Sequence, residues 1–447
     1  MAASMLIVED EEGVPREVAV AVQQIVPKIQ RDLNCLADPD RQTRRKGLLR
    51  LKGVVLEGKS GKPSSAYPKE VLASLFTQHL QGPLLKLFAD ASENCRETSL
   101  QLVHTFVSLV LDETAAGQGS CFARLGAVAF PAVAKRIGVN QAEAEPTEEI
   151  RLLHIRLVTT LLMKPSVVTA LENESVSHAV NQSIAKSLLD SFPDIKRECA
   201  ASIRALVKTA PNVARAEGDV LLRNLVANLG HQHSKTRQLT LQGLGQLVVC
   251  YAEPPAAGAT SAGAGAAPTD AAEAMEPADR TSLFNKLMDD VVIPGLHKCV
   301  VDHSAQVRHT IARMLSFLLR ARPEKTSALE KFEPTLLTML VTLSTDLTDE
   351  VTGVAEDCLA AVATHCLTNN NVAAVAGATG NETELTRYVG SMVPQMIPAL
   401  ISTTGHWTVT ERCKALDTLA AVIKVCDGGV WDAATKMAFG GGGGAAA

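Results

Sequence analysis

Aromatic residues are scarce in this sequence, which has two Trp, three Tyr and ten Phe among 447 residues. Bulky rings dominate the packing of large single cores, so their scarcity favours many small layers of Leu, Val and Ala. Ordered runs of alternating Val, Ile and Thr, which mark strands, are also missing, and almost no sheet is expected. The sequence therefore favours helices packed in thin layers.

Three further absences bound the class of protein. No stretch of ~18 uncharged apolar residues is present to span a membrane, and the acidic residues 1–13 lack the apolar segment of a secretory signal. A net charge of −5 and a pI of about 6.2 give no basic surface for a phosphate backbone. The ten cysteines are scattered along apolar stretches, as small hydrophobes in a reducing compartment are. We expect a cytoplasmic protein that binds neither membrane nor nucleic acid.

One sequence unit recurs along the chain, and its clearest copy surrounds Asp302. Asp302 suits a turn or helix N-cap, because its carboxylate can accept from the free amides of the next helix. After the turn, the apolar residues Val307, Ile311, Leu315 and Leu318 form one stripe of a helix. Pro294, in the preceding apolar run, is expected to kink the first helix rather than end it. The unit is thus a kinked helix, a turn and a second helix.

The same offsets recur elsewhere. A turn residue is followed five positions later by an apolar residue or Thr, six later by a basic one and nine later by a small or apolar one. Full or degenerate copies begin at Asp38, Asp90, Glu145, Asp190, His231, Asp346 and His406. Copies lie mostly ~40–55 residues apart, the period of two-helix units. This pattern resembles the HEAT repeat and implies an all-α, armadillo-like α-α superhelix, or solenoid, of about eight helix pairs.

Changes of composition divide the chain into five parts. We predict an acidic disordered N-terminus over 1–13, N-terminal repeats over 14–252 and further repeats over 281–430. Residues 253–280 are rich in Ala, Gly and Pro, and are predicted to be a disordered loop inserted between repeats. Residues 431–447 are a low-complexity end.

The acid and the base at each turn have two interpretations. In the first, each base pairs with the turn acid of the next repeat, which makes a charge ladder that stabilises the stack. In the second, the bases form a binding stripe along one edge. Regular repetition favours the ladder, whose expected members are Asp38, Arg44, Asp90, Arg96, Asp190, Lys196, Arg237, Asp302, Arg308 and Arg412.

Residues that depart from the repeat pattern are better candidates for binding a partner protein, since stacking does not dictate their identity. They are His231, Gln232, His233, Lys235, Trp407 and Arg45. Trp407 is one of only two tryptophans, and tryptophan is a frequent interface anchor. The alternative, that Trp407 fills a gap beside the next repeat, stays open.

Two groups of residues suggest specific chemistry but also have an ordinary structural explanation. Residues 53–60, Gly-Val-Val-Leu-Glu-Gly-Lys-Ser, match the phosphate-binding loop, which needs a preceding strand and a helix beginning at the lysine. Here a helix is expected before the motif, and Gly61 and Pro63 follow Lys59, so a nucleotide-binding enzyme is disfavoured. The histidines near His231 and His303 lack the tight paired spacing of zinc ligands. We therefore expect no catalytic residue, metal, cofactor or small-molecule substrate.

Several stretches resemble one known family. Residues 229–237, Leu-Gly-His-Gln-His-Ser-Lys-Thr-Arg, followed by Gly243-Leu244-Gly245, are similar to a repeat of the HEAT-repeat dynein axonemal assembly factors, the HEAT repeat-containing protein 2 family. Residues 196–199 leading to 208–211 resemble the repeat before it, and residues 405–409 with Arg412 resemble a later one. That family is longer, so the resemblance implies correspondence to its N-terminal part.

The resemblance implies a cytoplasmic scaffold or adaptor for the pre-assembly of axonemal dynein arms before their transport into cilia or flagella. Its implied partners are axonemal dynein chains, other assembly factors and chaperones. The alternatives are a general scaffold of the type-2A phosphatase kind and a nuclear transport receptor.

Overall fold

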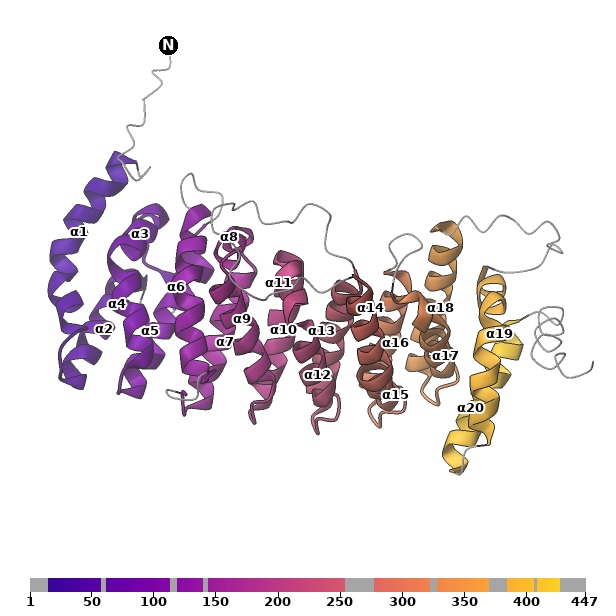
Figure 1. The fold of residues 1–447 in the computed structure, drawn as a ribbon. Coiled ribbons are helices and arrows are strands. Elements are labelled where there is room, and N and C mark those ends of the chain that lie inside the picture. The colour runs from indigo at the N-terminus through magenta and orange to yellow at the C-terminus, as the bar shows by residue number, and fades with distance from the viewer. Residues whose placement is uncertain are drawn as a thin grey trace, which may run out of the picture. The chain divides into compact units, whose positions relative to one another are not determined.

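Helices make up most of the computed structural model, which describes residues 15–57, 62–112, 119–139, 144–253, 277–321, 328–369, 384–405 and 408–426. The chain divides into two units, Met1–Glu217 and Gly218–Ala447. Each unit is a stack of antiparallel helix pairs, and the turn that joins a pair lies along the lower edge in Figure 1. The all-α repeat architecture expected from the sequence is confirmed.

The described part of unit 1 contains four helix pairs and two short extra helices. Its elements are α1 (Arg16–Cys35), α2 (Arg41–Val55), β1 (Leu56–Glu57), β2 (Lys62–Pro63), α3 (Lys69–Leu75), η1 (Phe76–Leu80), α4 (Gln81–Lys86), η2 (Leu87–Ala89), α5 (Glu93–Thr105), η3 (Phe106–Val110), α6 (Gly119–Ile137), α7 (Glu148–Leu162), η4 (Pro165–Val167), α8 (Val168–Leu171), α9 (Glu174–Leu188), α10 (Pro193–Thr209) and α11 (Pro211–Ala216). The second helices of successive pairs pack on one another, in the order α2, α5, α7 and α10.

Unit 2 contains four more pairs. Its elements are α12 (Gly218–Asn228), α13 (Ser234–Ala252), α14 (Pro277–Leu287), η5 (Met288–Val292), α15 (Ile293–Val300), α16 (Ala305–Arg320), η6 (Glu330–Phe332), α17 (Glu333–Leu343), α18 (Asp349–Asn369), α19 (Glu384–Thr404) and α20 (Val409–Val425). Here α13, α16 and α18 form the continuous row of second helices. Counting both units, the described residues form eight pairs.

Prolines bend the first helices without ending them. Pro83 and Pro294 follow the π-helical turns η1 and η5 by three and two residues. A proline lacks the amide donor, and its ring clashes with the carbonyl four residues earlier, at His79 and Asp290, so the wider π turn relieves the clash. The helix then resumes, so Pro294 does not end it, as was expected from the sequence.

Each interface between pairs is a thin apolar layer. On α16 the residues Val307, Ile311 and Leu315 are completely buried, and Leu318 is nearly so. Helix ends follow local rules: the Asp40 side chain accepts from the backbone amide of Thr43 at the start of α2. Burial of many such layers, each touching only its neighbours, stabilises the stack.

Two boundaries differ from those expected from the sequence. Helix α14 begins at Pro277, so residues 277–280 are helical rather than part of the inserted loop. Proline is tolerated in a first helical turn and Asp279 suits the positive end of the helix dipole, so the helix can start there. A short antiparallel pairing of Leu56 with Pro63 and Glu57 with Lys62 closes the region after α2. The expected segments 1–13 and 431–447 lie outside the described residues.

Candidate functional site

Most of the described turns between paired helices are closed by an acidic residue. The Asp90 Oδ1 atom accepts from the backbone amide of Ser92 at 2.7 Å, and Asp302 Oδ1 accepts from Ser304 at 2.8 Å. Asp38, Asp190 and Asp346 make the equivalent bond at 2.8–2.9 Å. A short carboxylate that bonds the amide two residues on is a strong turn former. The acid therefore fixes the entry to the second helix.

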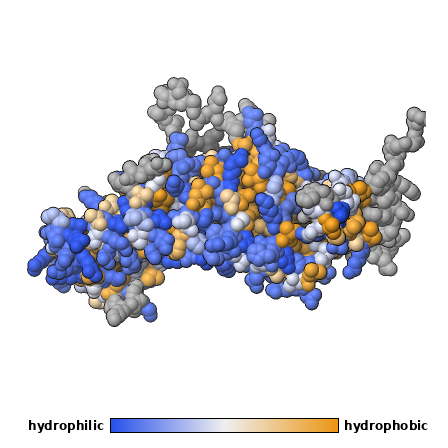
Figure 2. Space-filling view, turned by 90° about the horizontal axis from the view of Figure 1, so that it is seen from below, coloured by the Kyte–Doolittle hydropathy of each residue, from blue (hydrophilic) through white to orange (hydrophobic). Residues whose placement is uncertain are grey.

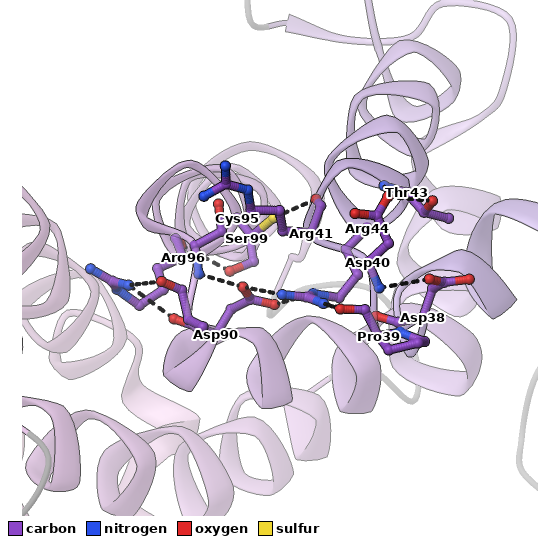
Figure 3. Close-up of polar contacts among 12 residues, drawn as sticks. Asp38, Pro39, Asp40, Arg41, Thr43, Arg44, Asp90, Cys95, Arg96 and Ser99 are labelled. Atoms are coloured by element: carbon purple, nitrogen blue, oxygen red, sulfur yellow. Dashed lines mark hydrogen bonds and ion pairs between the residues drawn. The ribbon is translucent and has the colours of Figure 1, made fainter.

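The arginine six residues after the turn acid connects one repeat to the next. Arg44 donates from Nη1 to the Asp38 and Pro39 carbonyls of its own turn, each at 2.8 Å. It also donates from Nε and Nη2 to the two Asp90 carboxylate oxygens, at 2.6 and 2.9 Å (Figure 3). The planar guanidinium group thus hydrogen-bonds the carbonyls of its own turn and forms a bidentate ion pair with the turn carboxylate of the next repeat.

Five such pairs form the charge ladder. Unit 1 holds Arg44–Asp90, Arg96–Glu145 and Arg151–Asp190, and unit 2 holds Arg237–Asp302 and Arg308–Asp346, with closest distances of 2.6–2.7 Å. No ladder side chain is more than 17% exposed. In the view from below, the N-terminal end of unit 1 around this edge is mainly hydrophilic (Figure 2).

Burial sets the electrostatics of the ladder. Burial opposes ionisation of Glu145, but hydrogen bonds from Arg96 and Arg136 outweigh it and hold the pKa of Glu145 below its ordinary value. The same balance, with Arg44 and Arg308 as donors, lowers the pKa of Asp90 and Asp346. Buried pairs add little net stability over an apolar contact, yet leaving one partner alone costs several kcal/mol. Breaking one pair of the ladder therefore costs more stability than forming it adds.

Some expected ladder members differ from this scheme, and others were missed. Lys196 donates from Nζ to the Leu188 carbonyl of its own repeat at 2.9 Å. The turn residue of the next repeat is His231, so no turn carboxylate stands at the position that pairs with the base in the ladder. The turn residue before Arg412, His406, lies outside the described residues. Glu145, Arg151 and Asp346 belong to the ladder although they were not among its expected members. The repeat offsets could have shown this, because Glu145 and Asp346 are turn residues and Arg151 stands six positions after Glu145. Nothing in the repeat spacing pointed to Arg136.

At the turn between α12 and α13, His231 stands in place of the acid and makes the same hydrogen bond to the backbone amide two residues on. The His231 Nδ1 atom accepts from the backbone amide of His233 at 3.1 Å, as a turn carboxylate would. Arg237 donates to the His231 and Gln232 carbonyls at 2.6 and 3.1 Å. The two histidine rings lie 5.3 Å apart.

The binding candidates that the structure describes lie at or near turns. Gln232, His233 and Lys235 are exposed at the turn between α12 and α13, and Arg45 is exposed on α2. Trp407 lies outside the described residues. The candidates thus form one cluster in unit 2 and one separate residue in unit 1.

Other possible chemistry is limited. Among the described residues, no group of three or more His, Cys, Asp and Glu side chains could hold a metal ion. Gly53, the first residue of the phosphate-loop-like motif, lies inside α2. The first element after the motif is the strand β2 at Lys62 rather than a helix. Residues 58–61 lie outside the described residues. Of the described helices, none alone has the length and apolar character of a membrane span; only the pair Glu148–Leu162 and Pro165–Leu171, bent by 98°, meets the criterion together.

Nothing in the sequence indicated that one histidine, on α7, is buried without a hydrogen-bond partner. His154 on α7 is 1% exposed, and neither ring nitrogen has a hydrogen-bond partner. Its ring meets Phe88 edge to face at 5.2 Å. Burial lowers the pKa of His154 to about 3. The ring is therefore a neutral core residue of unit 1.

Comparisons with known proteins agree with the repeat architecture. Residues 35–254 match the family model described as "Dynein axonemal assembly factor 5-like, TPR repeats". The chain is 28% identical over 228 residues to dynein axonemal assembly factor 5 of Xenopus laevis and 24% identical over 231 residues to that of Mus musculus. These matches cover 51% and 52% of this chain, but only a quarter of each relative.

Two solved structures are similar to this chain at a low level. A designed armadillo repeat protein in complex with the peptide (KR)4 is 14% identical with a TM-score of 0.42, over 65% of this chain and 98% of that one. An engineered protein is 11% identical, also with a TM-score of 0.42, over 65% of this chain and 96% of its own.

Proposed function

This chain belongs, through residues 35–254, to the dynein axonemal assembly factor 5-like family, and from this premise we propose that it is a scaffold in the assembly of axonemal dynein arms. The family match carries the proposal. It begins at the end of α1 and ends just after α13, so it takes in nearly all of the first five helix pairs.

The architecture suits a scaffold better than an enzyme. Each unit presents turns at regular intervals along one edge, and the buried ladder holds them at fixed spacing. A series of fixed turns can bind an incompletely assembled protein through several weak contacts at once. We propose that Gln232, His233 and Lys235, and separately Arg45, contact the partner, because their side chains are exposed.

The second part of the proposal concerns the compartment in which the chain acts and the proteins that it binds. We propose that it binds axonemal dynein chains in the cytoplasm, together with chaperones and other assembly factors, before the arms enter the cilium. Because this chain spans about a quarter of its curated relatives, the proposal concerns the part of the assembly task that these repeats perform.

Affinity capture from ciliated cells tests the proposal. The tagged chain is expressed in multiciliated cells of Xenopus laevis, and the cytosolic fraction is probed with antibodies against axonemal dynein heavy and intermediate chains. We expect these dynein chains in the captured material. Their absence, with the tagged chain folded and recovered, would contradict the proposed function.

Matched variants locate the contact. The triple variant Gln232→Ala, His233→Ala, Lys235→Ala should melt at nearly the wild-type temperature and capture less dynein. The control is Gln306→Ala, since Gln306 is also exposed and stands four residues after its turn acid, as Lys235 stands after His231. Equal losses for both variants would move the contact away from the His231 turn.

A further inference from the structure

The last helix pair of unit 2 packs differently from the pairs before it. Helices α16 and α18 continue the row of second helices, whereas α20 packs mainly against α19 and α17. The Thr342 and Thr418 hydroxyl groups, on α17 and α20, lie 2.9 Å apart. The ladder also stops here, because Thr352 stands where the two preceding repeats of unit 2 have Arg237 and Arg308. Its hydroxyl group donates to the Asp346 carbonyl of its own turn.

Beside this last pair is a cleft between α15, α17, α19 and α20, with a volume of about 420 Å³. Met339, Met396 and Leu400 contribute apolar, nearly buried side chains to its wall. Thr338 and Thr342 also line it, but their hydroxyl groups donate to carbonyls four residues earlier in α17, at 2.7 and 2.8 Å. The cleft is therefore apolar at its base, with few free hydrogen-bond donors.

The charge around the cleft has one sign. Lys298 and Lys414 line it from α15 and α20, together with His297, and no Asp or Glu is among its lining residues. Neither lysine forms an ion pair with another residue in the described part of unit 2. In a protein whose net charge is −5, a cleft whose only formally charged lining residues are two lysines favours an acidic partner over a basic one.

We propose that this cleft binds an acidic segment of a partner protein, with a large apolar side chain of that segment seated on Met339, Met396 and Leu400. Carboxylates beside the apolar anchor then lie at Lys298 and Lys414. The volume admits one or two side chains, so the cleft is one contact point within a larger interaction. The inference rests on the proposed function for the identity of the partner, but not for the chemistry of binding.

The two lysines and the apolar base of the cleft contribute to peptide binding in different ways. Exposed ion pairs contribute little affinity individually, whereas they speed encounter and orient the segment. Burial of one leucine side chain contributes about 1.5–3 kcal/mol, roughly a tenfold to hundredfold gain in affinity. A peptide with both features should therefore bind much more tightly than a peptide with either one.

Fluorescence anisotropy with defined peptides tests the inference on the full chain. The probe is a fluorescein-labelled peptide of alternating leucine and glutamate. Its controls are an all-glutamate peptide and an alternating leucine–lysine peptide of the same length. We expect saturable binding of the leucine–glutamate probe, weakened by salt, and at least about tenfold weaker binding of both controls.

Three variants assign the binding to the cleft. The double variant Lys298→Glu, Lys414→Glu should weaken probe binding at least about tenfold. Ala399→Trp fills the cleft from an exposed position on α19 and should weaken it similarly. Lys424→Glu reverses an exposed charge on the same α20 helix outside the cleft and should leave binding within about twofold of wild type.

Four outcomes would overturn the inference. They are no probe binding, equal binding of the all-glutamate or the leucine–lysine peptide, full binding by Ala399→Trp, and a loss with Lys424→Glu as large as with the double variant. Displacement of the probe by a single-stranded DNA oligonucleotide at equal concentration would also contradict it. Probe binding without dynein capture would contradict only the proposed function, and dynein capture without probe binding only this inference.

Discussion

Arg96 and Glu145 lie forty-nine positions apart in the chain, yet their side chains form a two-pronged ion pair inside unit 1. Arg96 Nε donates to Glu145 Oε2 at 2.6 Å, and Nη2 donates to Oε1 at 2.8 Å. Arg136 donates to the same carboxylate at 2.8 Å. With its own side chain fully buried, Glu145 neutralises two cations whose side chains are at most 10% exposed.

Glu145→Gln should therefore be among the most destabilising isosteric substitutions in the chain. It leaves two guanidinium groups buried beside a neutral amide, and removing one partner of a buried pair costs about 3–5 kcal/mol. Urea denaturation followed by circular dichroism measures the loss. Glu149→Gln, at an exposed acid four residues on, is the control and should change stability by less than about 0.5 kcal/mol. Similar losses for both would show that the buried pairs do not matter.

Arg308→Lys should destabilise unit 2 despite keeping the charge. Arg308 donates to both Asp346 carboxylate oxygens, to the Thr348 hydroxyl and to the Asp302 carbonyl, and one ammonium group cannot reproduce this fork. Loss of such charged hydrogen bonds costs about 1.5–3 kcal/mol. The thermal midpoint of the variant is compared with that of Arg313→Lys, which changes an exposed arginine on the same helix. Equal midpoints would reject the ladder as a structural device.

The fold could be predicted because stacking imposes local rules on every repeat. The offsets at Asp302, Val307 and Arg308 belong to one turn and one helix face, so they are visible in the sequence. The pairing of Arg308 with Asp346 was open to inference because adjacent repeats are equivalent.

The features that the sequence did not reveal depend on single departures from that regularity. Arg136 reaches Glu145 from the end of α6, and the pattern does not cover that position. The cleft near Lys414 lies where α20 packs on α19 and α17 instead of continuing the row of second helices. Spacing along the chain carries no information about which neighbouring helices the last pair will contact.

Two glycines on helices should respond oppositely to alanine. At Gly126 on α6, a Cβ atom would lie 2.8 Å from Val167 Cγ2 and 3.3 Å from Ala170 Cβ, whereas at Gly53 on α2 it would meet nothing within 4 Å. Alanine gains up to about 1 kcal/mol over glycine in a helix, and overpacking costs about 1–3 kcal/mol. Gly53→Ala should therefore raise the thermal midpoint, and Gly126→Ala should lower it. A lower midpoint for Gly53→Ala would show that the first glycine of the phosphate-loop-like motif has a conformational role.

His154 should make the wild-type protein sensitive to mild acid. Its pKa is about 3 in the folded chain and near 6.5 when unfolded, because burial disfavours the charged ring. Glu145 favours protonation, whereas Arg136 and Arg96 oppose it. The folded-state pKa is depressed, so the contribution of the neutral ring is complete above pH 6.5. It is lost as the pH falls toward 3, at up to about 1.4 kcal/mol per pH unit.

His154→Leu removes the titration and both unpaired nitrogens, so the variant should gain stability over wild type as the pH falls from 7 to 5. In this range Asp90, Glu145 and Asp346 stay ionised, since hydrogen bonds from arginines hold their pKa values below those of ordinary Asp and Glu, which titrate near pH 4. The free energy of unfolding is measured in urea at each pH, with His309→Leu on α16 as the control. Wild-type and His154→Leu curves that run parallel between pH 7 and 5 would show that His154 is protonated in the folded protein or reached by water.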